Sequence, residues 1–104
     1  MQVVLTVASL PQEPLAASAV LHARHLAEAE AMLEGEGVTA LAICLPAAGT
    51  DHDDWRRTLA RDLARAWTPK RVNLVGGPGG EARAAALAYL ADAPGITGQY
   101  IPLS

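Results

Sequence analysis

The chain has 104 residues, of which 51% are hydrophobic, and its formal net charge is −3 at pH 7 with no basic stripe, which argues against a nucleic-acid partner. The length fits one domain, residues 1–104, and no apolar run approaches the ~20 residues that span a bilayer, which excludes a membrane protein. A single cysteine, Cys44, fits a reducing compartment, so a soluble cytoplasmic protein is expected.

Apolar runs of strand length alternate with helical segments along the chain. β-Branched and apolar residues predict four strands: Gln2–Ala8, Val38–Leu45, Arg71–Val75 and Thr97–Leu103. Residues with high helix propensity predict three helices: Leu15–Glu34, one from Thr50 to the residues before Pro69, and Glu81–Leu90. The order β-α-β-α-β-α-β predicts an α/β, Rossmann-like fold with a small parallel four-stranded sheet.

The predicted strands are apolar along nearly their whole length, which is typical of a sheet that is buried on both faces. If the strands follow one another in simple order, right-handed crossovers place all three helices on one face. The other face is then bare, so either the strand order reverses or another subunit covers that face. We expect a dimer, and the many alanines, which bury little area each, also favour association.

The turn GGPGG is the first candidate site, because it lies between a predicted strand and a predicted helix. Gly77, Gly79 and Ala82 match G-x-G-x-x-G/A, and the N–H groups near Gly80 could hold an anion or a nucleotide phosphate. No acidic residue follows at the expected distance, and Glu81 places a carboxylate where the phosphate would lie. A tight turn is therefore favoured, with a nucleotide- or anion-binding module at Gly77, Gly79 and Gly80 as the alternative, and no cofactor is expected.

Histidine and cysteine offer no stronger site. His22 and His25 are three residues apart on a predicted helix and could present two imidazoles to a metal, with His52 as a third ligand. No pattern in the sequence fixes that geometry, so no metal is expected. Cys44 falls within an apolar strand, where an inert buried thiol is the ordinary interpretation, and no catalytic residue is predicted.

Several stretches between residues 38 and 104 share patterns with one family. RVNLVGGPG resembles the R-V-N-x-V-x-P-G strand and turn of short-chain dehydrogenases/reductases, and AALAYLADAPGITGQYIPL resembles their penultimate helix and last strand. ALAICLPAAG resembles their strand that ends in N-N-A-G, and DDWRRTLARDL resembles the helix that follows it. The resemblance implies a Rossmann-like fold.

The family's working residues have no counterparts in this sequence. QVVLTVASLPQEP carries no glycine where the family has its cofactor motif, and no Tyr-x-x-x-Lys pair is present, since Ala93 follows Tyr89 and Ser104 follows Tyr100 at that spacing. The resemblance therefore implies a shortened, non-catalytic member, not an enzyme, because hydride transfer lacks its general acid and its nicotinamide site.

The resemblance also implies a mode of action. The family uses the Trp-containing helix, the last helix and the last strand for subunit contacts, and the sequence retains all three. We therefore expect a homo-oligomer, or an accessory subunit on a full-length reductase. The residues expected at the interface are Trp55, Leu59, Leu63, Leu87, Tyr89 and Tyr100.

Overall fold

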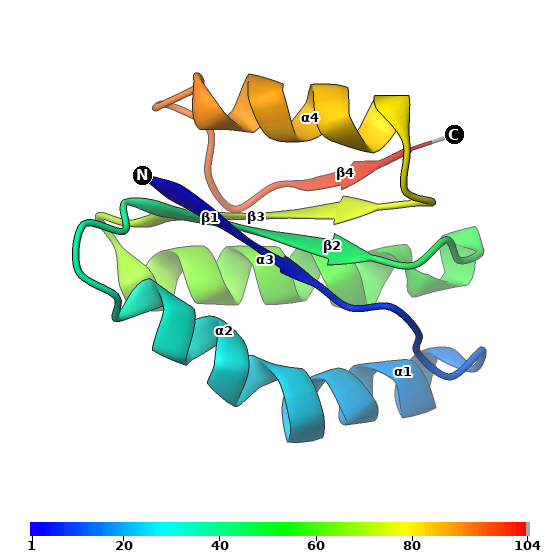
Figure 1. Ribbon diagram of the computed structural model, residues 1–104. Helices are drawn as coiled ribbons and strands as arrows, with labels where there is room; N and C mark the ends of the chain where they lie inside the picture. Colours follow the sequence, from blue (N-terminus) through cyan, green and yellow to red (C-terminus); the bar gives the residue numbers. More distant parts are fainter. Residues whose placement is uncertain (104) are drawn as a thin grey trace.

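The computed structural model describes residues 1–103, which form a four-stranded parallel sheet with helices on both faces (Figure 1). The strands, in spatial order, are β1 (Gln2–Thr6), β2 (Ala40–Leu45), β3 (Arg71–Gly76) and β4 (Tyr100–Pro102). The helices are α1 (Pro14–Val20), a π-helical turn (Leu21–His25), α2 (Leu26–Leu33), a 3₁₀ turn (Thr50–His52), α3 (Asp53–Trp67) and α4 (Glu81–Ala91). The predicted α/β class and element order are confirmed.

The central strand β2 divides the core into two unequal halves. Its residues are all buried, and alternate side chains point to opposite faces of the sheet. Leu41, Ile43 and Leu45 pack with leucines of the π-helical turn, α2 and α3 in the larger cluster. Ala42 and Cys44 pack on the other side, in a small cluster whose other buried members are Val75 of β3 and Leu90 of α4.

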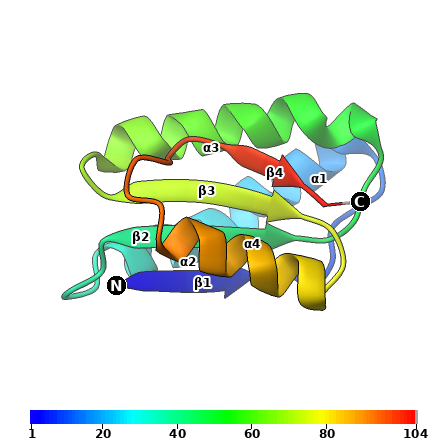
Figure 2. The same cartoon turned by 90° about the horizontal axis from the view of Figure 1, so that it is seen from above.

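The helix α4 corrects the expectation of a bare sheet face. The strands do follow one another in simple order, yet α4 lies on the face opposite α1, α2 and α3 (Figures 1 and 2). Because β3, α4 and β4 continue in the same direction across the sheet, this crossover has the opposite hand from the first two. The premise that all three crossovers are right-handed is therefore wrong, and α4 covers part of the second face from within the same chain.

The glycine turn supplies the physical reason for this change of face. Gly77 has φ +144° and Gly80 has φ +127°, conformations that residues with a Cβ rarely adopt. A Cβ at Gly77 would also lie 2.7 Å from the Cβ of Leu103. The turn therefore needs glycine to lead the chain from β3 up onto the second face.

Two predicted elements differ in detail from those observed. The helix predicted over Leu15–Glu34 is present but contains the π-helical turn. There the His22 ring nitrogen Nδ1 donates to the Ser18 carbonyl at 2.8 Å, so a side chain takes part in the i to i−4 hydrogen bonds of the helix. The last strand is shorter than predicted, because the Asn73 side chain, not the β3 backbone, bonds the Gln99 N–H at 3.1 Å. Among residues 1–103, no helix is both long and apolar enough to cross a membrane.

Candidate functional site

A cavity with a volume of about 730 Å³ lies at the carboxyl ends of β1 and β2. One wall is the loop after β1, residues 8–13, and the other is the loop after β2, residues 46–49. His52 and Arg56, at the start of α3, complete the lining. Ligands of open α/β sheets bind outside the carboxyl ends of the strands, so the cavity is in the expected place for a site.

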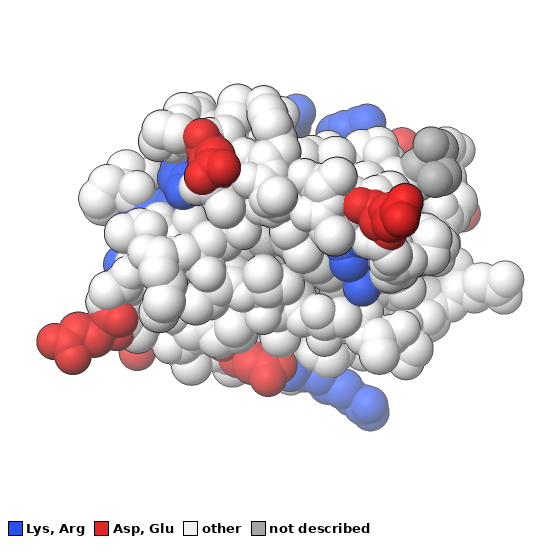
Figure 3. Space-filling model, turned by 45° about the horizontal axis from the view of Figure 1, so that its top comes forward, with Lys and Arg blue, Asp and Glu red and all other residues white. Residues whose placement is uncertain are grey.

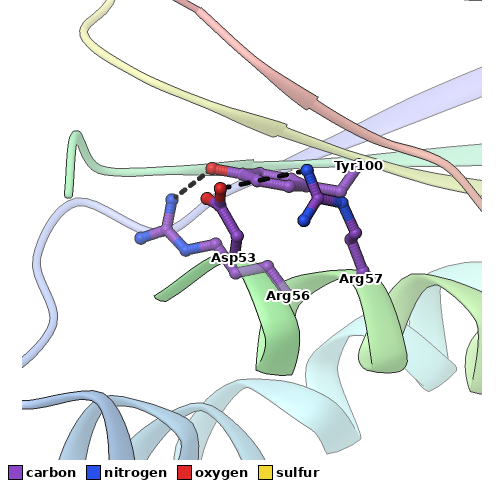
Figure 4. A network of polar contacts seen from close by, with 4 residues as sticks. All are labelled: Asp53, Arg56, Arg57 and Tyr100. Atoms are coloured by element: carbon purple, nitrogen blue, oxygen red, sulfur yellow. Dashed lines mark hydrogen bonds and ion pairs between the residues drawn. The ribbon is translucent and has the colours of Figure 1, made fainter. Parts of the chain in front are cut away.

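Arg56 is the most unusual residue of this cavity, because its side chain is only 1% exposed although it carries a full charge. Nη1 donates to the Tyr100 hydroxyl at 3.1 Å and Nη2 donates to the Pro46 carbonyl at 3.0 Å (Figure 4). The guanidinium carbon lies 5.4 Å from the Trp55 ring centroid and 5.6 Å from that of Tyr100, within range of cation–π attraction. Its Nε is buried and has no hydrogen-bond partner within the part of the chain that the structure describes.

His52 is the second buried polar residue of the cavity, with 4% of its surface exposed. Its Nδ1 accepts a hydrogen bond from the Trp55 indole N–H at 3.1 Å, so this nitrogen carries no proton. The Gln12 carbonyl lies 2.9 Å from Nε2, and Nε2–H donates to it. Both ring nitrogens are therefore engaged, and the ring ties the loop after β1 to α3.

The two acidic residues of the cavity lining differ in what they do. The carboxylate of Glu13 caps α1, accepting from the N–H groups of Leu15 at 3.1 Å and Ala16 at 2.9 Å. Asp51 is exposed in the 3₁₀ turn that precedes α3. With Arg56 they give the lining a formal charge of −1, counting His52 as neutral.

The glycines of the predicted anion site lie outside this cavity. The Gly77 N–H, one of the groups expected to hold an anion, donates to the Leu45 carbonyl at 3.1 Å. The Gly77 carbonyl accepts from Arg83 Nη2 at 2.7 Å. Gly79 and Gly80 are exposed, and none of the three glycines lines the cavity. Anion binding at Gly77, Gly79 and Gly80 stays a prediction.

The histidines considered as metal ligands are not brought together. His22 and His25 lie in the π-helical turn, whereas His52 belongs to the cavity at the carboxyl ends of the strands. Within residues 1–103, no group of three or more His, Cys, Asp or Glu side chains could hold a metal ion.

The residues predicted for a subunit interface lie mostly inside the monomer. Leu59 and Leu63 are 4% and 6% exposed and pack in the larger core cluster, and Trp55 and Tyr100 pack against it. Leu87 packs against the small cluster beneath α4. Tyr89 alone among the six is a large exposed side chain, with 58% of its surface open.

Cys44 is fully buried beneath α4. Desolvation raises the pKa of its thiol, and the positive charge of Arg83 opposes this rise. A raised pKa disfavours the thiolate, so the structure supports the interpretation of an inert thiol.

The residues of the R-V-N pattern hold α4 and β4 to the sheet. Arg71 Nη1 donates to the carbonyls of Leu90 and Ala93 at the end of α4, at 2.9 and 3.0 Å. Asn73, which is 2% exposed, donates to the Ile96 carbonyl at 3.0 Å and accepts from the Gln99 N–H. These side chains add to the backbone hydrogen bonds from the Gly98 N–H to the Val72 carbonyl and from the Leu74 N–H to the Gln99 carbonyl, where the chain returns to form β4.

Sequence reasoning missed the role of Arg56 and His52. Arg56 lies on a helix that carries charges of both signs, so it resembled the exposed arginines around it, and His52 directly precedes that helix. The available signal was periodicity, because Arg56 is three and seven residues before Leu59 and Leu63 and so shares their buried face.

Comparison with protein families gives one match, to the short chain dehydrogenase-like protein family (SDR-like), over residues 5–103. A search of the curated proteins and a search of the solved structures gave no match. The family match covers the end of β1 from Leu5, the other three strands and every helix. This chain therefore belongs to the short chain dehydrogenase-like family.

Proposed function

We propose that this protein is a non-catalytic member of its family that acts by pairing with a second copy along the open edge of β1. The observation that carries the proposal is the composition of that edge. β1 presents five residues, QVVLT, without a charge or a proline. Natural sheets protect their edges with charged residues, proline, bulges or very short strands, and β1 has neither a charged residue nor a proline.

The backbone of β1 offers groups for a further strand. The Val7 N–H donates to the Cys44 carbonyl, and the Met1 carbonyl accepts from the Thr39 N–H. Residues of a parallel ladder alternate in the direction of their backbone groups, so those of Gln2, Val4 and Thr6 point to the open edge. A two-fold axis beside β1 would pair two copies in antiparallel fashion and join their sheets.

The surface beside this edge is suited to contact with protein. Figure 3 shows a broad area without Lys, Arg, Asp or Glu over α4 and β1. Only Glu81 and Arg83 are charged among the 11 residues of α4, whereas seven of the 15 residues of α3 are charged. Val4 and Tyr89 expose 39% and 58% of their surfaces there, and a second copy would cover part of this apolar area.

The chemistry of the carboxyl-end cavity supports a role without catalysis. The family's Tyr-x-x-x-Lys pair is missing from residues 1–104. Two groups of the cavity that could transfer a proton are already engaged. The Glu13 carboxylate caps α1, and the His52 ring is hydrogen-bonded at both nitrogens. We therefore expect no hydride transfer from NADPH to carbonyl compounds in a spectrophotometric assay.

Sedimentation equilibrium of the purified protein tests the pairing. We expect a dimer that dissociates on dilution, and a monomer for Val4→Lys, since two copies would place like charges beside one another at the shared edge. Leu15→Lys is the matched control, because Leu15 is 81% exposed on α1, on the opposite face, and its replacement leaves the dimer intact. Circular dichroism checks that both variants remain folded.

A wild-type protein that stays monomeric at hundreds of micromolar would contradict self-pairing. An equal loss of the dimer in Val4→Lys and Leu15→Lys would place the contact elsewhere. Docking on a full-length reductase is the other association that the resemblance implies, and a strict monomer that copurifies with such a reductase would favour it over pairing of two copies.

A further inference from the structure

We infer that the cavity at the carboxyl ends of β1 and β2 binds a small carboxylic acid through the buried guanidinium of Arg56. This inference is independent of the pairing along β1, because the cavity is lined by the loops after β1 and β2 and by the start of α3. The cavity is also separate from the glycine turn, where anion binding is a prediction of its own.

The charge of Arg56 has no anionic partner in the part of the chain that the structure describes. The one ion pair there joins the neighbouring residue Arg57 to Asp53, at 3.9 Å (Figure 4). Arg56 instead makes two hydrogen bonds to neutral oxygens, and its buried Nε has no acceptor among residues 1–103. A buried charge without a counter-ion is unfavourable, so an oxyanion that enters the cavity gains a strong partner.

Arg56 lies at the carboxyl ends of β2 and β3, next to the loops that line the cavity. The chain leaves β2 toward α3 on one face and leaves β3 toward α4 on the other (Figure 1). Arg56 reaches the carboxyl end of β2 at the Pro46 carbonyl, and a Cβ at Gly76, the last residue of β3, would lie 2.7 Å from its Nη1. The guanidinium therefore lies at the carboxyl-end edge of the sheet, where ligands of open α/β sheets bind.

The remaining charges select the class of anion. Glu13 and Asp51 line the same cavity as Arg56, so one positive charge faces two negative ones. A phosphate dianion would be repelled by both carboxylates, whereas a single carboxylate matches the one guanidinium in charge and in planar geometry. The volume of about 730 Å³ admits a small organic acid with a polar body that can donate hydrogen bonds to Asp51.

Nuclear magnetic resonance can follow the site through its tryptophan. The Trp55 indole N–H donates to His52 in the cavity lining, whereas Trp67 lies 12 residues later on α3, roughly 18 Å away along the helix. We expect sodium acetate to shift the Trp55 indole signal in a saturable manner and to leave that of Trp67 unchanged. Sodium phosphate and sodium chloride at matched ionic strength and pH serve as the competing anions.

Three variants make the test specific. Arg56→Gln weakens acetate binding roughly tenfold or more, because a hydrogen bond to a charged group is lost. Arg57→Gln, the matched control on the next and exposed residue, leaves the affinity unchanged. Asp51→Asn tightens acetate binding roughly two- to fivefold and keeps the inference testable if Arg56→Gln does not fold.

Each contrary result overturns the inference. A shift of equal size with chloride would show general screening in place of a site. Tighter binding of phosphate than of acetate would refute the carboxylate class, and an unchanged affinity in folded Arg56→Gln or in Asp51→Asn would remove the assigned charges from the site.

Discussion

The two edges of the sheet are built in opposite ways. β4 has three residues, ends in Pro102, and is held by side chains: Asn73 bonds the segment before it, and Arg56 bonds its Tyr100. β1 has five residues and neither a charge nor a proline, and the outward groups of Gln2, Val4 and Thr6 have no partner strand. The difference indicates that β4 closes the fold whereas β1 is left to pair, so damage at β4 should lower stability and damage at β1 should lower association.

The largest effect is expected from Asn73→Ala at the β4 edge. The substitution removes two hydrogen bonds and leaves the Ile96 carbonyl and the Gln99 N–H without partners, so the free energy of unfolding should fall by about 2 kcal/mol. Urea denaturation measures the loss. Gln99→Ala, which removes an exposed side chain with one 3.4 Å hydrogen bond, should cost less than about 0.5 kcal/mol. An equal loss of unfolding free energy in the two variants would contradict the role of Asn73 in holding the segment before β4.

Gly76→Ala should have an intermediate effect at the same edge. The new Cβ would lie against the Tyr100 hydroxyl and 2.7 Å from Arg56 Nη1, so it pushes apart the pair that ties β4 to α3. We expect a loss of roughly 1–2 kcal/mol in unfolding free energy.

The control for Gly76→Ala is Gly95→Ala, where no atom lies within 4 Å of an added Cβ. Its stability should stay within about 0.5 kcal/mol of the wild type. A Gly76→Ala protein as stable as this control would show that the Arg56–Tyr100 contact adds nothing to the β4 edge.

The smallest effect concerns Cys44 on β2, between the two edges. Its pKa is raised in the folded protein by burial, so the folded state keeps its proton at a pH where the unfolded chain has lost it. The stability that the folded protein gains by keeping this proton is present below the pKa of the unfolded thiol, about 8.5, and it is lost as pH rises through the pKa of the folded thiol. Stability measured from pH 7 to 10 should fall slightly more steeply for the wild type than for Cys44→Ala, and identical slopes would contradict the raised pKa.

Much of the fold could be predicted because apolar runs and helix propensity are local properties. The four strands, their order along the chain and the three helical segments follow from such patterns. The hand of the last crossover could not be predicted, since it depends on where α4 finds apolar cover, at Ala42, Cys44 and Val75. The glycine turn carried the signal, but its glycines were interpreted as a tight turn, with a phosphate site as the alternative, and not as a change of face.

The candidate site was less accessible to sequence reasoning. His52 and Arg56 look like ordinary polar residues of a charged helix, and only the three-dimensional meeting of residues 8–13, 46–49 and α3 turns them into the lining of a cavity. Tyr100, 44 residues from Arg56, was expected at a subunit interface and instead bonds Arg56 within the monomer. Local periodicity does not indicate partners that are so far apart in the sequence.

Hydrogen exchange at two protein concentrations tests the central claim, that β1 pairs with a second copy while β4 closes the fold. Above the dissociation constant, the outward amides of Val4 and Thr6 should become protected, and they should lose this protection on dilution. The amides around β4, such as Leu103, which bonds the Gly76 carbonyl within the monomer, should exchange at one rate at both concentrations. Protection that depends on concentration at β4 or at α3, and not at β1, would contradict the account.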